Sequence, residues 1–154
     1  MKYRVCKIFE IESGHMLLKH PGRCRYPHGH SRRIEVVVAR DQLDQNDMVC
    51  DFKALKLALT AFLDAFDHAL LVNAADPILE ALPENLSKRI IVLENEDPTT
   101  EVLARRIFER LEQQIAHKQS LTDEQGQHYR LPADLCIERV RVSETSSSWA
   151  EYGV

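Results

Sequence analysis

Alternating apolar residues predict β-strands near both ends of the chain. Residues 3–11 place Tyr3, Val5, Phe9 and Ile11 on one face, and residues 33–39 form a β-branched apolar run. Towards the C-terminus, residues 135–144 and 149–152 have the same strand-like character. Together these four segments predict an antiparallel sheet with four strands.

Apolar residues at steps of three and four predict two amphipathic helices between these strands. The first follows Asp51, a good N-cap, and its apolar face runs from Phe52 to Phe66. The second begins around residues 98–101 and continues through an apolar face that ends at Ile115. Residues 75–86 predict a short helix interrupted by Pro83, residues 90–93 are extended, and residues 118–134 predict a surface loop. We therefore expect an α+β fold with two main helices on one face of the sheet.

Composition narrows the class of protein. A chain of 154 residues is the usual size of one domain, so we expect a single domain over residues 1–154. The net charge of −4 argues against a nucleic-acid-binding surface, and the apolar runs are too short to cross a bilayer. The N-terminus has no signal-peptide pattern, and the four cysteines form no CxxC. We expect reduced thiols in a cytoplasmic protein.

Three histidines carry the clearest chemical signal. His28 and His30 are two residues apart in an extended segment, so both imidazoles project to the same side. If the first two strands pair as a hairpin, His15 returns to the same place, and three neutral imidazoles match a catalytic zinc site with a fourth position open. His20 is an alternative third ligand, and the spacing by itself leaves open that the HGH segment is only a polar turn.

Several residues near these histidines could transfer protons. Cys24 lies four residues before His28 between two arginines, and a nearby metal would also favour its thiolate. Asp67 could orient His68 as a proton shuttle. Glu144, at the end of a predicted strand, could accept two parallel N–H bonds from a flat heterocycle.

Taken together, these residues resemble the 6-pyruvoyl-tetrahydropterin synthase / 6-carboxy-tetrahydropterin synthase family. Six matching segments occur in order over nearly the whole chain: residues 9–17 (FEIESGHML), 24–30 (CRYPHGH), 49–56 (VCDFKALK), 66–71 (FDHALL), 98–104 (PTTEVLA) and 142–152 (VSETSSSWAEY). The chain departs from the family at Val72, where relatives often have Asn, and in its longer segments 74–96 and 118–134.

The resemblance implies a tunnelling fold whose sheets join into a barrel, as a homohexamer (a dimer of trimers). It implies that His15, His28 and His30 bind Zn²⁺, and that Cys24, Asp67 and His68 are catalytic. It also implies that the pterin ring is bound by Glu144, with a pocket lined by Thr99, Thr100 and Glu101.

The spacing between Cys24 and His28 is similar to that of the bacterial carboxy enzymes, which act in queuosine biosynthesis. The expected reaction converts 7,8-dihydroneopterin triphosphate to 6-carboxy-5,6,7,8-tetrahydropterin, acetaldehyde and triphosphate. Three alternatives remain at this point: a 6-pyruvoyl-tetrahydropterin synthase, a non-catalytic pterin- or purine-binding relative, and a structural zinc protein in which Cys24 is the fourth ligand.

Overall fold

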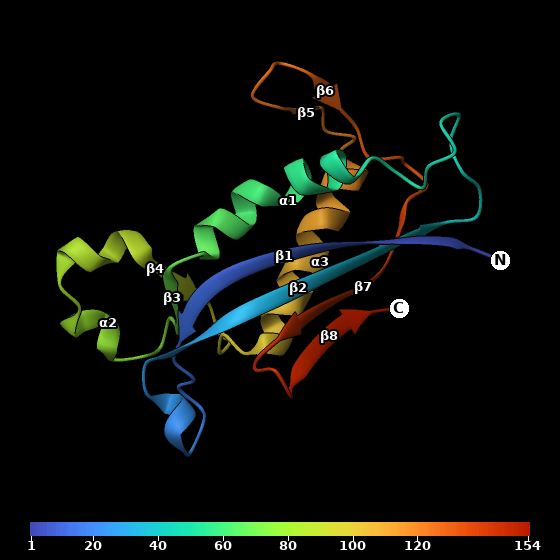
Figure 1. Ribbon diagram of the computed structural model, residues 1–154. Helices are drawn as coiled ribbons and strands as arrows, with labels where there is room; N and C mark the ends of the chain where they lie inside the picture. Colours follow the sequence, from blue (N-terminus) through green and yellow to red (C-terminus); the bar gives the residue numbers. More distant parts are fainter.

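The computed structural model describes residues 1–154 and contains one mixed six-stranded sheet. The strand order is β4-β3-β1-β2-β7-β8 (Figure 1). The bounds of these strands are β1 Tyr3–His15, β2 His28–Arg40, β3 Ala69–Asn73, β4 Ile90–Leu93, β7 Cys136–Ser143 and β8 Trp149–Gly153. The α-helices are α1 Phe52–Phe66, α2 Ile78–Ala81 and α3 Thr100–Ala116, and short 3₁₀ turns cover Arg23–Arg25 and Glu84–Arg89.

The predicted four-stranded antiparallel sheet is wrong in its extent. β1, β2, β7 and β8 do pair antiparallel, but β3 pairs parallel to β1, and β4 pairs parallel to β3. The two added strands are short apolar runs without alternation, a pattern typical of strands covered on both sides. The run at β3 follows α1 closely and was missed, whereas residues 90–93 were predicted to be extended but were not counted among the four strands of the sheet.

The segment 118–134 is also more ordered than the predicted surface loop. Within it, β5 Leu121–Thr122 and β6 His128–Tyr129 form a small antiparallel hairpin. Leu121 and Tyr129 are partly buried against the core, which gives the hairpin an anchor. Its turn contains Gly126 at a φ of 80°, a conformation that favours glycine.

Both predicted helix starts are confirmed by their caps. The Asp51 side chain accepts a hydrogen bond from the backbone N–H of Lys53, and the Thr99 side chain accepts one from Val102. These bonds satisfy backbone donors that the first helical turn leaves free. The cap at Thr99 matters for the site, because it fixes the start of α3 next to the ends of β1 and β7.

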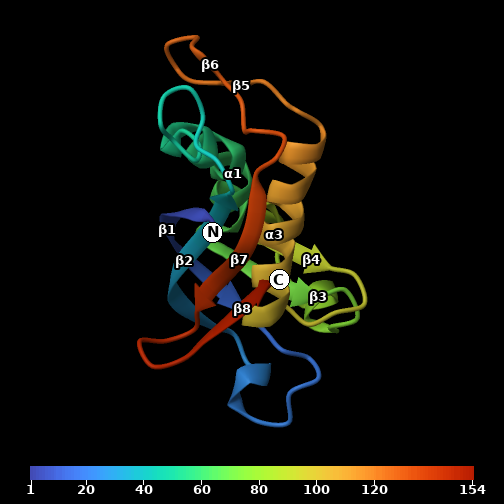
Figure 2. The same ribbon diagram turned by 90° about the vertical axis from the view of Figure 1, so that its right-hand side faces the viewer.

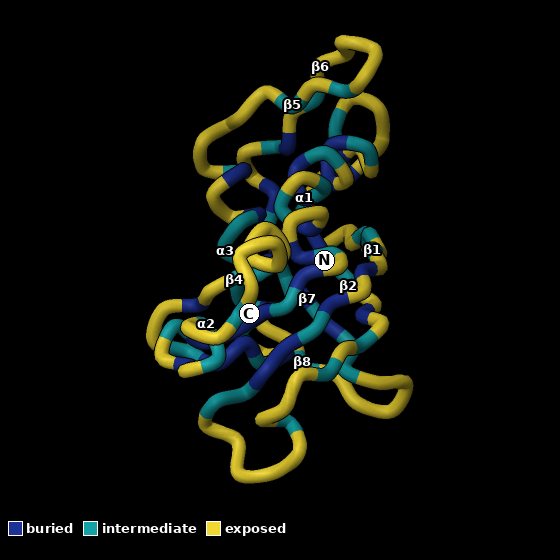
Figure 3. Tube along the Cα trace, turned by 90° about the vertical axis from the view of Figure 1, so that its left-hand side faces the viewer, coloured by how far each residue is buried: buried dark blue, intermediate teal, exposed yellow.

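The two long helices pack on the sheet through one hydrophobic core (Figure 2). Alternate residues of β2, Ile34, Val36 and Val38, are fully buried in the same cluster as Leu59 of α1 and Ile107 of α3. Figure 3 shows that buried segments follow β2, β7 and the inner sides of the helices, whereas the β5–β6 hairpin is largely exposed. No helix is both long and apolar enough to cross a membrane.

Candidate functional site

The β1–β2 hairpin brings the three histidines together, as predicted. In its register His15 lies opposite His28, and His30 lies opposite Ser13. Paired residues share a face of the sheet, and so do residues two apart on one strand. The ring centroids are 4.4 Å apart for His15 and His28, and 5.1 Å apart for each of the pairs with His30. β1 and β2 extend as far as these histidines, beyond residues 3–11 and 33–39 that the sequence predicted as strands.

The ring nitrogens of the histidines are arranged as metal ligands require. Nδ1 of His15 donates to the carbonyl of Pro98 at 2.8 Å, and Nδ1 of His28 donates to the carbonyl of Tyr26 at 2.7 Å. Because a carbonyl only accepts, each Nδ1 carries the proton and leaves the Nε2 lone pair free. The Nε2 atoms of all three rings are buried without a hydrogen-bond partner. Such orphaned acceptors fit a metal ion bound at their centre.

Electrostatics favour the neutral rings that a metal needs. His15 is only 1% exposed, and burial lowers its pKa to about 4. Burial also lowers the pKa of His30. Both imidazoles are therefore uncharged at neutral pH, with their lone pairs available for coordination.

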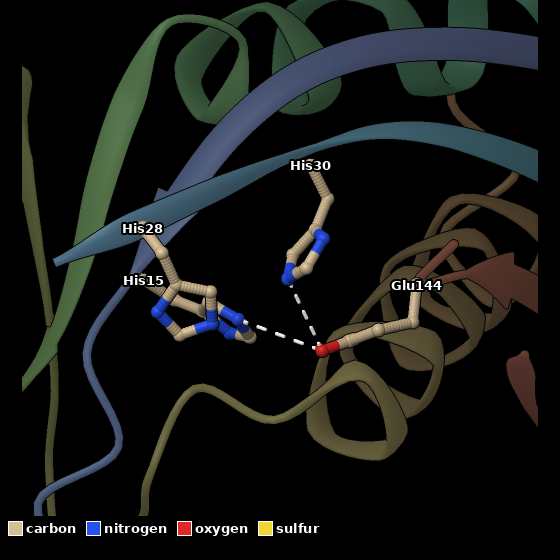
Figure 4. A group of neighbouring side chains, drawn as sticks. All are labelled: His15, His28, His30 and Glu144. Atoms are coloured by element: carbon tan, nitrogen blue, oxygen red, sulfur yellow. Dashed lines mark ion pairs between the residues drawn. The ribbon is translucent and has the colours of Figure 1, made fainter. Parts of the chain in front are cut away.

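Glu144 completes this cluster from the turn after β7 (Figure 4). Its Oε1 lies 3.2 Å from Nε2 of His30, without a hydrogen bond, and 3.7 Å from Nε2 of His15. One ligand atom from each of these four residues lies within 4.8 Å of the others. Sequence analysis predicted that Glu144 binds a heterocycle but did not predict that its carboxylate would face the imidazoles.

Cys24 and His20 are not members of the four-residue cluster but lie beside it. Both line a hollow of about 320 Å³, which His15 and Glu144 also border. The backbone carbonyl of Cys24 accepts a hydrogen bond from the N–H of Leu17, which holds the loop at the end of β1. His20 instead accepts a hydrogen bond from the N–H of Gly22 through its Nδ1, so the structure favours His15 over His20 in the cluster.

The start of α3 forms another wall of the same hollow. Thr99, Thr100 and Glu101, the predicted pocket residues, all line it. The hydroxyl of Thr100 accepts a hydrogen bond from Arg32. The structure therefore brings eight of the ten predicted site residues into one region: His15, Cys24, Thr99, Thr100, Glu101 and Glu144 around the hollow, with His28 and His30 in the adjoining cluster.

Asp67 and His68 form a pair on a different side of the cluster. Oδ2 of Asp67 lies 3.1 Å from Nδ1 of His68, and Oδ1 accepts a hydrogen bond from the backbone N–H of Glu12. The bond from Glu12 and the neighbouring His68 lower the pKa of Asp67. His68 borders a second hollow, of about 330 Å³, together with His30. Within one chain, the structure thus does not bring His68 and Cys24 into the same hollow.

The backbone at His68 fixes this placement. Its φ is 56°, a left-handed conformation uncommon for a residue with a side chain. Its N–H donates to the carbonyl of Glu12 at 2.6 Å, tying the end of α1 to β1. The side chain itself is 73% exposed. The conformation turns the chain sharply from α1 into β3 and leaves the imidazole accessible from outside.

Arg32 is a site residue that sequence analysis missed. It is two residues beyond His30 on β2, so it projects to the same face, and only 2% of it is exposed. Its guanidinium contacts Ser13, Thr100 and Glu144 directly behind the cluster. Continuing the i, i+2 alternation from His28 and His30 would have identified it.

A larger hollow, of about 440 Å³, lies elsewhere, along β2, β7 and β8. Its arginines are paired with neighbouring carboxylates: Arg33 with Glu35, and Arg141 with Glu151. It contains no histidine or cysteine. The chemistry of the chain therefore concentrates at the smaller hollow beside the histidines.

Comparisons with known proteins show which family the chain belongs to. The sequence pattern of the family described as 6-pyruvoyl tetrahydropterin synthase matches residues 4–153. A 6-carboxy-5,6,7,8-tetrahydropterin synthase from Aquifex aeolicus is 29% identical over 171 residues, which cover 99% of this chain and 98% of that protein. The protein of the same name from Synechocystis is 34% identical over 114 residues, covering 71% of this chain and 74% of its own.

Solved structures show the same fold. An uncharacterized protein from Wolinella succinogenes has a TM-score of 0.79 at 21% identity, with 99% of this chain and 98% of that chain covered. The 6-pyruvoyl tetrahydropterin synthase of Plasmodium vivax has a TM-score of 0.67 at 16% identity, with coverage of 100% and 99%. The resemblance expected from the six sequence segments is thereby confirmed, and the chain belongs to the 6-pyruvoyl tetrahydropterin synthase family of enzymes.

Proposed function

We propose that this chain is a 6-carboxy-5,6,7,8-tetrahydropterin synthase. It would convert 7,8-dihydroneopterin triphosphate and one water to 6-carboxy-5,6,7,8-tetrahydropterin, acetaldehyde and triphosphate, with queuosine biosynthesis as its pathway. The observation that carries the proposal is the convergence of three unpartnered Nε2 atoms beside a hollow that contains a cysteine. Relatives named for this activity over nearly the full chain length support it.

The three histidines would hold Zn²⁺. Neutral imidazoles are good zinc ligands, and three of them leave a coordination place for substrate. Bound zinc would supply Lewis-acid chemistry, polarising the side-chain hydroxyls of the substrate so that the adjoining C–H protons become more acidic. The carbonyls of Pro98 and Tyr26 keep the rings of His15 and His28 oriented towards the ion.

Cys24 would be the thiolate that takes a proton from the substrate side chain. It lines the same hollow as His15, so a side chain bound there lies within its reach. Glu144 would hold the pterin ring through parallel N–H bonds to its carboxylate, beside the wall formed by Thr99, Thr100 and Glu101.

Asp67 and His68 would act on substrate held by another copy of the chain. His68 borders one hollow and Cys24 borders another, so the two residues of a single chain do not share a pocket. A homohexamer, arranged as a dimer of trimers, would bring His68 of one copy to the thiol side of another. β4 and β8 are the edge strands of the sheet and leave ladder groups free for pairing, which supports closure into a barrel.

The test is turnover of 7,8-dihydroneopterin triphosphate by the zinc-loaded full chain, with pterins and acetaldehyde measured together. The proposal expects equal amounts of acetaldehyde and 6-carboxy-5,6,7,8-tetrahydropterin. Loss of triphosphate without acetaldehyde would instead identify a 6-pyruvoyl-tetrahydropterin synthase, the activity named by the family. A Cys24→Ala variant should bind zinc and pterin but not turn over. Intact substrate after incubation with the zinc-loaded wild type would refute an enzymatic role.

A further inference from the structure

A single buried carboxylate ties the loop that carries Cys24 to the rest of the chain. This thiol loop (residues 16–27) joins β1 to β2 and projects beyond the end of their hairpin (Figures 1 and 2). The hydrogen bonds of residues 17–25 stay within the loop, with one exception. The backbone N–H of Lys19 donates to Oδ2 of Asp97 at 2.8 Å. Among the hydrogen bonds of residues 17–25, this one alone fixes the loop relative to the rest of the chain.

Asp97 is itself held from the side of the sheet. It is 8% exposed, and its Oδ1 accepts a hydrogen bond from Nδ2 of Asn73 at 2.8 Å. Asn73 is 2% exposed and ends β3, which pairs with β1 as far as His15. A carboxylate accepts such N–H bonds more strongly than a neutral oxygen does, and burial strengthens them further. The side chain of Asp97 thus connects the sheet beside the histidine cluster to the thiol loop.

The carboxylate of Asp97 does not cap the helix that follows it. The first turn of α3 is capped by the side chain of Thr99, which accepts from the N–H of Val102. Asp97 contributes to this turn through its backbone carbonyl, which accepts from the N–H of Thr99 at 2.8 Å. The next carbonyl, that of Pro98, accepts from Nδ1 of His15. The backbone of Asp97 therefore belongs to the turn that orients a histidine, whereas its side chain holds the thiol loop.

The bond at Lys19 reaches Cys24 through Leu17. The N–H of Leu17 donates to the carbonyl of Cys24 at 3.0 Å, and the carbonyl of Leu17 accepts from the N–H of His20. Lys19 lies in the turn between Leu17 and His20, so the turn that is anchored is also the one bonded to Cys24. We propose that Asp97 is a positioning residue that holds the thiol of Cys24 at the hollow beside the histidines. This inference rests on the proposed function for the role of that thiol.

Asp97→Leu tests the inference, because leucine has a similar shape but no acceptor oxygen, and hydrogen exchange resolved to single amides measures the loop. In the zinc-loaded protein, the amides of Lys19 and Leu17 should exchange about tenfold faster or more than in wild type. Leu17 is not a hydrogen-bond partner of Asp97, so its increase reports the release of the segment bonded to Cys24. An unchanged rate at Leu17 would overturn the inference.

Kinetics and metal binding separate positioning of the thiol from damage to the metal site. In Asp97→Leu, kcat for 7,8-dihydroneopterin triphosphate should fall about tenfold or more, because the thiol is no longer held in place. Zinc affinity should stay within about twofold of wild type, because backbone bonds hold the turn that orients His15. Asp97→Asn keeps one acceptor oxygen and should recover part of kcat. A wild-type kcat in folded Asp97→Leu would contradict the proposal, as would a loss of zinc that accounts for the loss of kcat.

Asp76→Leu is the matched control. Asp76 is 6% exposed and accepts a hydrogen bond from the backbone N–H of Ile78 at 2.9 Å, but it has no hydrogen bond to the thiol loop. The same substitution at this similarly buried carboxylate should leave kcat and exchange at Leu17 at their wild-type values. Equal effects of the two variants would show that loss of stability alone explains the result, and the proposal would fail.

A measurement on the wild type keeps the inference testable if Asp97→Leu does not fold. The amide of Lys19 should exchange about tenfold more slowly, or slower still, than the amides of Leu18 and Cys24, which have no acceptor. Equal rates at these three amides would refute the anchor. If exchange behaves as expected while wild type leaves 7,8-dihydroneopterin triphosphate intact, the proposed reaction fails and the anchoring of the thiol loop by Asp97 stands.

Discussion

The metal-free protein should lose stability as the pH falls from about 6.5 to about 4, chiefly through His15. Burial, the largest influence on this ring, lowers its pKa, and the charges of Arg32 and His28 act in the same direction. The Pro98 carbonyl and Glu144 partly oppose them. In the unfolded chain the ring has a pKa near 6.5. Between pH 6.5 and about pH 4 the unfolded state therefore binds a proton at this ring, whereas the folded state does not.

The expected size follows from the two pKa values. One pKa unit corresponds to about 1.4 kcal/mol, so a change from 6.5 to about 4 corresponds to a loss of about 3 kcal/mol over the interval. This contribution is fully present above pH 6.5 and is lost by about pH 4. The pKa of His30 is lowered as well, which adds to the loss in the same direction.

Urea unfolding followed by circular dichroism, with chelator present, measures this effect. Between about pH 6 and about pH 5, the free energy of unfolding of wild type should fall with a slope of about 1.4 kcal/mol per pH unit for each proton involved. His15→Asn removes the titrating ring and should give a flatter curve, whatever its absolute stability. Parallel plots of unfolding free energy against pH for the two proteins would show that the His15 ring is not held neutral by burial in the folded state.

Other perturbations separate binding, chemistry and scaffold. His28→Ala should lower the metal content of the protein, because His28 belongs to the cluster. His68→Ala should lower kcat and leave the metal content unchanged, because His68 lies outside the cluster. Metal analysis and steady-state kinetics on both variants check these two expectations. Asp97→Ala should destabilise the fold by about 3 kcal/mol in urea unfolding, because Asp97 is buried and accepts from Asn73 Nδ2 and the N–H of Lys19. Asp134→Ala, which removes an exposed ion pair with Arg40, should cost less than about 1 kcal/mol in the same assay. Chelation of wild type should lower its Tm, and added zinc should restore it, because an ion held by the three histidines would bind the folded protein and not the unfolded chain.

The parts of the fold that were predictable are those with a regular local pattern. The alternation in β1 and the apolar steps in α1 and α3 identified these elements, and Asp51 and the segment 98–101 marked the helix starts. β3 and β4 could not be assigned in the same way. Their short apolar runs have no periodicity. Each pairs in parallel with a strand that is distant in the sequence, and such pairing leaves no recognisable pattern in the local sequence.

The candidate site shows the same division between local and non-local information. The i, i+2 spacing of His28 and His30 predicted a shared face, and the hairpin prediction brought His15 to it. The approach of Glu144 to these rings depends on the pairing of β2 with β7, which the sequence does not reveal. The separation of His68 from Cys24 could not be predicted from the sequence either, because it depends on where the chain rejoins the sheet after α1.

The continuous pairing of β1 with β2 limits where the chain can change in length. The register runs unbroken from Tyr3 opposite Arg40 to His15 opposite His28, and a slip of one residue would turn one strand's side chains to the opposite face. An insertion or deletion inside either strand would therefore separate the imidazoles even if the sheet still formed. Residues 16–27 join the two strands beyond the last pair, so that segment can be lengthened or shortened while the histidines keep their places. Cys24 lies within this segment, so the position of its thiol can change among related chains without moving the three histidines.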